Sequence, residues 1–291
     1  MAGLTPDRAR LPSRVRVAVC YFTGTGNTAT AARELADRFG PDNPTDLHSI
    51  EMLPATLSPD FFDCCDLVGF GSPAYAYNEP PAFTRFLKEL PPGNGRPAFL
   101  FMTAGQDPEA CLEYPGRTLR RKGYELRATA CLFMPGNVGC YWFEDGRMVF
   151  RFLSPTRRFD IGKMERERNE RIDRLVSALL DGRAVFEPVT PRQRLVSWSL
   201  RGVFHHAAAP LMKLLPVTVD GCDLCGLCVR TCPSRSIRIL DGRVRFSASC
   251  TVCVRCLNIC PQHAIRVRWP LSILNRPEQY LSKGWSPPRH G

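Results

Sequence analysis

Apolar and polar residues follow two alternating patterns over roughly the first 180 residues of the chain. Short apolar runs rich in β-branched and aromatic residues predict buried strands, and apolar residues spaced three or four positions apart predict amphipathic helices. Strands are expected over residues 15–22, 46–51, 66–71, 97–103 and 124–133, and helices over 29–39, 80–90, 108–122 and 162–180. Five strands that alternate with helices predict an α/β fold with a doubly wound parallel sheet.

The patterns also divide the chain into segments. We expect an N-terminal extension (1–14), an α/β domain (15–182), a basic amphipathic linker (183–215), a cysteine-rich domain (216–268) and an irregular, proline-containing tail (269–291). Asp181-Gly182 ends the last helix of the α/β domain. The linker has no acidic residue after Glu187, so it either packs between the two domains or lies on an anionic membrane surface. Packing between the domains is favoured, because a fusion must fix its domains.

The first predicted strand runs directly into a loop of threonines and glycines that opens the first helix. The loop consists of Thr23, Gly24, Thr25, Gly26, Asn27 and Thr28. Threonine hydroxyls, glycine backbone N–H groups and a helix N-terminus together bind phosphate. No lysine follows the last glycine and G-x-G-x-x-G is absent, so ATP and Rossmann dinucleotides are disfavoured and FMN fits best. The alternative is a plain turn rich in Thr and Gly.

Ligands of such sheets lie beyond the carboxyl ends of the strands, which indicates the loops after the third and fourth strands. The candidate contacts to a flavin ring are Pro73, Tyr75, Tyr77 and Asn78 after the third strand, and Thr103, Gly105 and Gln106 after the fourth. The two tyrosines suit stacking on an isoalloxazine ring, although either could pack on the protein surface instead. Residues 134–142, after the fifth strand, form either a roof over the flavin, a substrate pocket or a structural cover.

The loop sequence YFTGTGNT resembles the phosphate loop of flavodoxins, whose pattern is Ser/Thr-x-Thr-Gly-x-Thr. The resemblance assigns Thr23, Thr25, Gly26, Asn27 and Thr28 to the positions that bind the FMN phosphate. It implies a flavodoxin-like, five-stranded parallel sheet, and it assigns the aromatic loop after the third strand to the flavin ring.

Eight of the 14 cysteines form two copies of one spacing. The run C-x2-C-x2-C-x3-C-P occurs at Cys222, Cys225, Cys228 and Cys232, and again 28 residues later at Cys250, Cys253, Cys256 and Cys260. It resembles the run of bacterial two-cluster ferredoxins, which implies a small α+β domain with two [4Fe–4S] clusters. The resemblance also implies crossed ligation, with Cys222, Cys225, Cys228 and Cys260 on one cluster and Cys232, Cys250, Cys253 and Cys256 on the other. Two zinc sites are the alternative. They are disfavoured because zinc motifs usually place two ligands per knuckle, whereas each run here has three followed by Cys-Pro. A disulfide framework is less favoured still.

The remaining composition bears on location. Residues 1–14 lack the apolar core of a secretion signal, and no run of 18 apolar residues predicts a membrane span. Cluster thiolates also need reducing conditions. The sequence therefore predicts a cytoplasmic protein, of an anaerobic or microaerobic prokaryote, with at most peripheral membrane contact.

The chain carries a formal net charge of +11. Its basic residues are mostly scattered arginines without interleaved aromatics, which argues against nucleic acid as the partner. An acidic redox protein or an anionic small molecule is the better expectation. The oligomeric state is not predicted.

The whole arrangement resembles fused flavodoxin and bacterial-type ferredoxin proteins over residues 15–182 and 216–268. The resemblance implies an electron-transfer iron–sulfur flavoprotein that connects an external carrier, two [4Fe–4S] clusters and FMN. One alternative is an FMN-dependent reductase of an organic electron acceptor, fed by its own ferredoxin domain. The other is a ferredoxin whose flavin-free first domain only docks partners.

Overall fold

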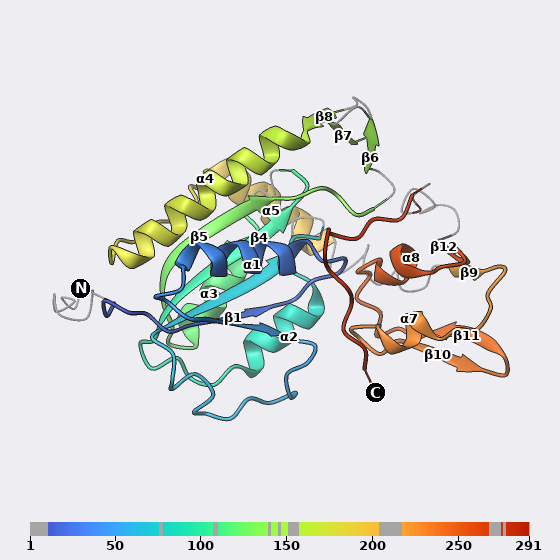
Figure 1. Cartoon of the computed structure of the whole chain (residues 1–291), viewed down its shortest axis with the longest axis horizontal. Coiled ribbons are helices and arrows are strands. Elements are labelled where there is room, and N and C mark those ends of the chain that lie inside the picture. The colour runs from blue at the N-terminus through green and yellow to red at the C-terminus, as the bar shows by residue number, and fades with distance from the viewer. Residues whose placement is uncertain are drawn as a thin grey trace.

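The computed structural model describes residues 11–75, 78–106, 110–138, 141–144, 147–150, 157–203, 217–267, 275 and 278–290. The larger part of the molecule is a β-sheet with helices on both faces, and a smaller cysteine-rich part lies beside it (Figure 1). None of the described helices combines the length and the apolar composition needed to cross a bilayer.

The central sheet contains the five predicted strands. They are β1 (Val17–Tyr21), β2 (Thr45–Ser49), β3 (Leu67–Pro73), β4 (Pro97–Ala104) and β5 (Glu125–Phe133). All neighbouring pairs are parallel, and the strand order is β2-β1-β3-β4-β5. This 2-1-3-4-5 order is that of flavodoxin-like doubly wound sheets. The fold is flavodoxin-like. The predicted α/β fold class is thus confirmed.

Helices cover both faces of the sheet and bury a separate core on each. They are α1 (Asn27–Phe39), α2 (Pro81–Glu89), α3 (Glu113–Arg121), α4 (Ile161–Leu180) and α5 (Pro191–Val203). On one face Phe83 of α2 and Leu119 of α3 pack in the core, and on the other Leu35 of α1 and Ile172 of α4 do so. Apolar residues at helical spacing therefore predicted α1, α2, α3 and α4 correctly. Helix α3 begins at Glu113, later than the predicted start at residue 108, because residues 110–112 form turns.

A small antiparallel sheet precedes α4 and was not predicted. It consists of β6 (Tyr141–Glu144), β7 (Arg147–Phe150) and β8 (Arg157–Asp160), in that spatial order. Asp160 ends the sheet and caps α4, because its Oδ1 accepts a hydrogen bond from Lys163 N at 2.7 Å. The pair Asp145-Gly146 between the largely apolar runs YWFE and RMVF is a hairpin signal that the strand prediction did not use.

The chain continues along the outer edge of β5 after α4 ends. Val185 accepts a hydrogen bond from Thr129 N at 2.9 Å and donates one to Arg127 O at 3.0 Å. Glu187 adds a side-chain contact, since its Oε1 accepts from Cys131 N at 3.2 Å. The segment after Gly182 therefore covers part of the edge of the sheet, which shields its unpaired backbone groups.

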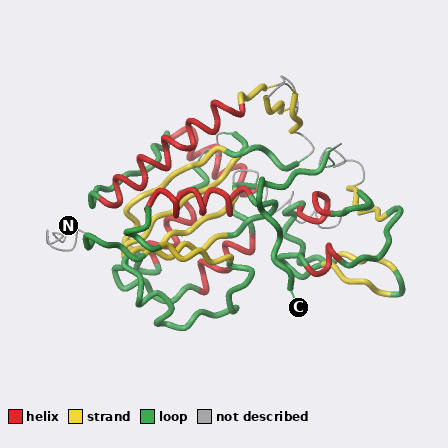
Figure 2. The backbone as a smooth tube through the Cα atoms, in the orientation of Figure 1, coloured by secondary structure: helices red, strands yellow, loops and turns green. Residues whose placement is uncertain are grey.

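Residues 217–267, called the cysteine segment below, contain only short elements (Figure 2). They are β9 (Val217–Val219), α7 (Leu227–Arg230), β10 (Ile237–Leu240), β11 (Arg243–Phe246), α8 (Arg255–Ile259) and β12 (Ile265–Val267). Strands β9 and β12 pair antiparallel, and β10 and β11 form a hairpin. The buried apolar set of this segment is small and consists largely of cysteines and their neighbours. A segment of this size has a marginal core unless it is cross-linked or binds a metal group.

Candidate functional site

The predicted phosphate loop joins β1 to α1 at the carboxyl end of the sheet, beside the change in strand order between β1 and β3. Thr23 Oγ1 accepts a hydrogen bond from Gly26 N at 3.0 Å and closes the loop on itself. Gly26 has a φ of 101°, which a residue with a side chain adopts only with strain. The hydrogen bond from Thr30 N to Gly26 O is the first backbone bond of α1. The backbone N–H groups that precede Thr30 at the start of the helix therefore have no acceptor within the helix. These amides are donors suited to an anion.

The threonines of the loop are buried and tie it to two other loops. Thr28 and Thr103 share a hydrogen bond between their hydroxyls at 2.8 Å, which links the loop to the end of β4. Thr25 Oγ1 accepts from Asn137 Nδ2 at 2.9 Å, which links it to the segment after β5. Thr23, Thr25 and Thr28 are at most 1% exposed. The structure thus brings the predicted phosphate loop together with Thr103 of the predicted flavin-ring set.

The loop after β3 forms a tight turn over the same end of the sheet. Pro73 is the last residue of β3, and Tyr75 and Asn78 exchange backbone hydrogen bonds of 2.7 and 3.0 Å. Ala74 N donates to Thr103 O at 2.8 Å, so the turn lies next to the end of β4. Asn78 is fully buried. Tyr77 lies outside the described residues, so its predicted stacking role stays a prediction.

Two buried polar atoms of the predicted ring set have no hydrogen-bond partner among the described residues. They are the Tyr75 hydroxyl and Gln106 Oε1. Gln106 follows Gly105 at the end of β4, as expected from the sequence. Burial raises the pKa of the Tyr75 phenol well above its usual value, so it stays a neutral donor. An unpaired buried donor and acceptor, beside a loop with free amides, fit a ligand that has both acceptors and donors, as FMN has.

The cysteine segment touches the phosphate loop through Cys253. A Cβ atom on Gly24 would lie 2.9 Å from Cys253 O and 2.3 Å from the Tyr75 hydroxyl oxygen. Only glycine therefore fits at position 24 without displacing a neighbour. Cys253, Gly24 and Tyr75 are thus in direct contact, although they come from three distant parts of the sequence.

Arg255, two residues after Cys253, holds this contact. Its Nη2 donates to Thr23 O at 2.6 Å, and its Nε donates to Gly24 O at 2.8 Å. Its guanidinium also pairs with both carboxylate oxygens of Glu51, at 2.6 and 2.7 Å. Arg255 is 1% exposed, and a charge this deeply buried requires such a complete set of partners. Neither Arg255 nor Glu51 was predicted, because nothing in the spacing of the cysteines marks the residue between two of them.

The motif cysteines of the cysteine segment lie close enough to one another for their thiols to interact electrostatically. Burial raises the pKa of Cys228 to about 11, and the neighbouring thiols Cys222, Cys260 and Cys225 contribute to the increase. Burial also raises the pKa of Cys256 well above its usual value, with contributions from Cys253, Cys250, Cys232 and Cys228 in that order. We call Cys222, Cys225, Cys228 and Cys260 the first cysteine group, and Cys232, Cys250, Cys253 and Cys256 the second. Among the described residues no three Cys, His, Asp or Glu side chains are placed to bind one metal ion together.

The two halves of the cysteine segment repeat each other in backbone detail. Backbone N–H groups donate to Cys222 Sγ, Cys232 Sγ, Cys250 Sγ and Cys260 Sγ, each at 3.4 Å. The donors are residues 224, 236, 252 and 264, so each bond in the first half recurs 28 residues later. Leu224 and Val252 both have positive φ, and so do Gly226 and Val254. A β-branched residue such as Val254 adopts this conformation only where its surroundings impose it.

The C-terminal residues 278–290, called the tail below, cross the phosphate loop. Tyr280 donates from its hydroxyl to Asn27 Oδ1 at 2.7 Å, and Asn27 Nδ2 in turn donates to Pro135 O at 2.7 Å. Ser282 N donates to Thr25 O at 2.8 Å. The ring of Trp285 lies 2.8 Å from the position that a Cβ on Gly26 would occupy. The irregular tail expected from its prolines is therefore wrapped against the candidate phosphate site.

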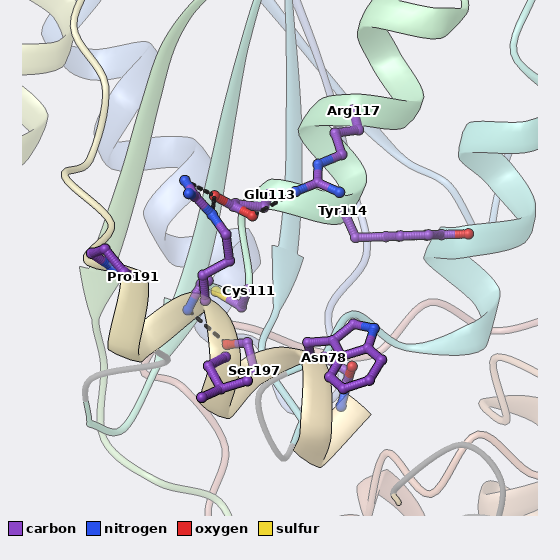
Figure 3. Close-up of a pocket in the computed structure, with 11 residues that line it drawn as sticks. Asn78, Cys111, Glu113, Tyr114, Arg117, Pro191 and Ser197 are labelled. Atoms are coloured by element: carbon purple, nitrogen blue, oxygen red, sulfur yellow. Dashed lines mark hydrogen bonds and ion pairs between the residues drawn. The ribbon is translucent and has the colours of Figure 1, made fainter. Parts of the chain in front are cut away.

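Helix α5, in the predicted linker, packs on the α/β domain next to α3. Ser197 Oγ accepts from Ala110 N at 2.8 Å, and Arg194 pairs with Glu113 at 2.6 Å. A pocket of about 460 Å³ lies between these elements and Asn78 (Figure 3). Glu113 lies between Arg117 and Arg194 at its wall, and its charge is shared between them. The pocket therefore adjoins the turn after β3 that is predicted to contact the flavin ring.

The predicted roof over the flavin is only partly described. Met134 is buried and donates from its backbone N to Ala104 O at 2.9 Å, so the segment starts beside the end of β4. Asn137 O accepts from Asn258 Nδ2 of the cysteine segment at 3.2 Å. Residues 139 and 140 and the side chains of the following strand lie outside the described set. Whether the segment admits a substrate stays a prediction.

No protein-family model matches the chain, and no curated protein matches it. Solved structures are similar to it. A Megasphaera elsdenii flavodoxin is 22% identical over 40% of this chain and 84% of its own, with a TM-score of 0.34. A flavodoxin, WrbA-like protein from Agrobacterium tumefaciens is 16% identical over 58% and 99%, with a TM-score of 0.38. Rubredoxin oxygen:oxidoreductase from Desulfovibrio gigas is 14% identical over 59% and 38%, with a TM-score of 0.37. The strand order of the sheet, rather than these similarities, establishes the fold.

Proposed function

We propose that the chain is an electron-transfer iron–sulfur flavoprotein that binds FMN and two [4Fe–4S] clusters. The observation that carries the proposal is the contact of Cys253 with Gly24 and Tyr75. This contact joins a predicted cluster ligand to the predicted phosphate loop and to a predicted flavin-ring residue. A short connection between two cofactor sites is what internal electron transfer requires.

The donor sets fit these groups. The phosphate loop offers backbone amides and threonine hydroxyls for a phosphate, and the loops after β3 and β4 would hold the ring. Each thiolate of a cubane ligates a different iron, so a cluster needs four thiols spread around a volume and not donors converging on one ion; each predicted ligand set supplies four cysteines. When bound, the clusters would pass single electrons from an external carrier and FMN would collect two of them with two protons from solvent.

The chain's own residues position and shield these sites. Arg255 fixes the second cysteine group against the phosphate loop through bonds to Thr23 O and Gly24 O. Burial raises the pKa of the Cys253 thiol to about 11, and the positive charge of Arg255 beside it offsets part of that increase. The tail covers the loop on the side of Asn27 and so limits access of water. Each of these contacts holds the two sites in one fixed relationship.

The test is cofactor analysis of full-length protein purified without oxygen. We expect about one FMN per chain, together with roughly eight iron and eight sulfide, the content of two cubanes. Stepwise reduction of the clusters should then bleach the flavin absorbance. Clusters without flavin would instead support the docking-scaffold alternative, and zinc in place of iron would reject the proposal.

A second candidate function is an FMN-dependent reductase of an organic acceptor, favoured by the pocket beside Asn78. Its volume of about 460 Å³ lies within the roughly 300–1,000 Å³ range of ligand pockets. Tyr114, Trp198 and Leu195 supply apolar walls, and Trp198 is 75% exposed. Saturable turnover of a quinone or nitroaromatic acceptor, lost in Trp198→Ala but kept in Met52→Ala at another exposed apolar residue, would establish this function. Non-saturable reduction that both variants retain would exclude it.

We further propose a cytoplasmic location and a redox protein as partner. Eight thiols held for clusters require a reducing compartment. The exposed arginines Arg238, Arg243 and Arg245 of the cysteine segment favour an anionic counterpart. Fractionation of native cells tests the location. The salt dependence of binding to a redox protein tests the partner.

A further inference from the structure

The hairpin of β10 and β11 presents an unusual set of side chains on one face. Arg238 lies opposite Arg245 in the register, and Leu240 lies opposite Arg243. Because side chains alternate between faces along a strand, these four residues share one face of the hairpin. All four are exposed, and Leu240 is 53% exposed. We call this set the arginine face.

The charges on the arginine face are not neutralised by the described part of the chain. Like charges directly opposite each other in a hairpin destabilise it. Yet Arg238, Arg243 and Arg245 have no ion pair or side-chain hydrogen bond among the described residues. Buried or half-buried arginines of the α/β domain behave differently, for example Arg168, which pairs with Glu34 at 2.8 Å. The hairpin therefore retains positive charge that an external anionic group would stabilise.

The arginine face belongs to the same part of the molecule as the first cysteine group. The opposite face of the hairpin, which carries Ile239, packs toward this group, because the Ile239 side chain lies 3.9 Å from the position of a Cβ on Gly226, between Cys225 and Cys228. Cys225 is exposed, and Leu224 beside it is 42% exposed. The second cysteine group is instead held against the phosphate loop by Arg255. The first group is thus the accessible one.

We propose that the arginine face docks an acidic one-electron carrier protein and places it across the thickness of the hairpin from the first cysteine group. This inference rests on the proposed electron-transfer function and names the partner-facing side of the molecule. Exposed apolar residues flanked by unpaired cations match a protein interface with an apolar centre and a charged rim. Phe246 is the sole Phe, Tyr or Trp in residues 217–267, and it pairs with Ile237 on the other face. A nucleic-acid strand would therefore find no exposed aromatic ring for stacking.

Charge reversal tests the proposal with an acidic [2Fe–2S] ferredoxin as the probe. The variant is full-length Arg238→Glu/Arg243→Glu/Arg245→Glu, and a second version carries Gln at the same positions. The matched control is Arg85→Glu/Arg121→Glu/Arg192→Glu, which changes the net charge equally at exposed arginines of α2, α3 and α5. Calorimetry at low and high salt gives the affinity for the probe. Rapid mixing with the reduced probe gives the rate at which the chain is reduced, and photoreduced deazariboflavin serves as an uncharged comparison.

We expect charge reversal on the arginine face to weaken probe binding by about tenfold or more and to remove most of its salt dependence. The Gln version should show a smaller loss in the same direction. The control should stay within about twofold of the natural protein, and reduction by deazariboflavin should be unchanged in all variants. Unchanged iron content shows that the hairpin substitutions leave the cysteine segment folded.

Three results would overturn the proposal. Equal losses in the variant and the control would assign binding to net charge and not to this face. Unchanged probe binding in the variant would place the docking surface elsewhere. The natural protein and the control could instead bind anionic vesicles or an oligonucleotide that the variant does not bind, while the variant still binds the probe. That result would assign the face to lipid or nucleic acid. Calorimetry measures probe binding whether or not flavin is present. An absence of flavin would therefore reject the proposed function and would leave the docking proposal to be decided by calorimetry.

Discussion

Arg255 and Glu51 form a buried, bidentate ion pair between the cysteine segment and the α/β domain. Their two hydrogen bonds measure 2.6 and 2.7 Å, and their side chains are 1% and 2% exposed. Glu51 follows β2 and Arg255 begins α8. The two residues are 204 positions apart in the sequence. Trp285 of the tail lies over the guanidinium, with its ring centre 5.4 Å from Cζ. Three distant segments therefore converge on one buried charge pair.

Removing one partner of this pair should be strongly destabilising. Glu51→Gln keeps the shape but leaves a buried guanidinium uncompensated, at a cost of about 3–5 kcal/mol. The control is Asp46→Asn, whose exposed pair with Arg16 at 3.6 Å is worth at most about 1 kcal/mol. Denaturant unfolding under anaerobic conditions, followed by cluster absorbance for the cysteine segment, measures the difference. Equal midpoints for the two variants would show that the buried pair does not hold the segments together.

A side chain at position 24 should separate the two candidate cofactor sites. Gly24→Ala places a Cβ 2.3 Å from the Tyr75 hydroxyl and 2.9 Å from Cys253 O, so the turn after β3 or the cysteine segment must move. We expect FMN binding to weaken by about five- to 150-fold, because an extra carbon forced into a packed site costs about 1–3 kcal/mol. Fluorescence titration of the apoprotein with FMN provides the measurement.

Tyr75→Phe is the companion to this experiment. It removes the atom that the new Cβ would meet first, so Gly24→Ala/Tyr75→Phe should recover part of the lost affinity. By itself Tyr75→Phe should leave stability unchanged or slightly higher, because it deletes a buried hydroxyl that has no partner among the described residues. Gly162→Ala is the control, since Gly162 has no positive φ and a Cβ there meets only the side-chain ends of Asp160 and Arg166, at 3.3 and 3.5 Å. A double variant no better than Gly24→Ala alone would mean that Cys253 O sets the limit.

Loss of the tail should release the phosphate loop. A chain that ends at Gln279 lacks the bonds from Tyr280 to Asn27 and from Ser282 to Thr25. The bonds of Ser282 to Thr30 and of Arg33 to Gly284 O are lost as well. We expect FMN to dissociate at least about tenfold faster, since each hydrogen bond contributes about 0.5–1.5 kcal/mol. Transfer of FMN to an excess of apoflavodoxin follows the rate. Tyr280→Phe, which removes one bond only, should give an intermediate rate; slower dissociation after truncation would show that the tail competes with FMN.

Single cysteine substitutions test the crossed ligation. Cys260→Ser should remove the cluster of the first cysteine group, although Cys260 lies in the second run of the sequence, and Cys232→Ser should remove the other. Iron should fall from roughly eight to roughly four per chain in each variant, with different electron paramagnetic resonance signals remaining. Cys64→Ser, at an exposed position outside both groups, should keep all the iron. Identical remaining signals in the two variants would contradict the crossing.

The sequence by itself determined the fold of the first domain. Five apolar runs alternating with amphipathic helices allow one economical architecture, a parallel sheet covered on both faces, and the TGTGNT loop marks its ligand end. The two cysteine runs likewise marked a pseudo-symmetric segment, and the backbone bonds to sulfur repeat at the same spacing of 28 residues. These features were predictable because each depends on residues close together in the chain.

The tertiary structure alone decided how the two parts meet. Nothing near position 255 predicts that its arginine lies against Thr23, Gly24 and Glu51, and nothing near position 280 predicts a bond to Asn27. The charges of the hairpin were visible in the sequence, but their position on one face depends on the register of β10 and β11. Contacts between distant segments are set by packing and burial of whole surfaces, which no local pattern records.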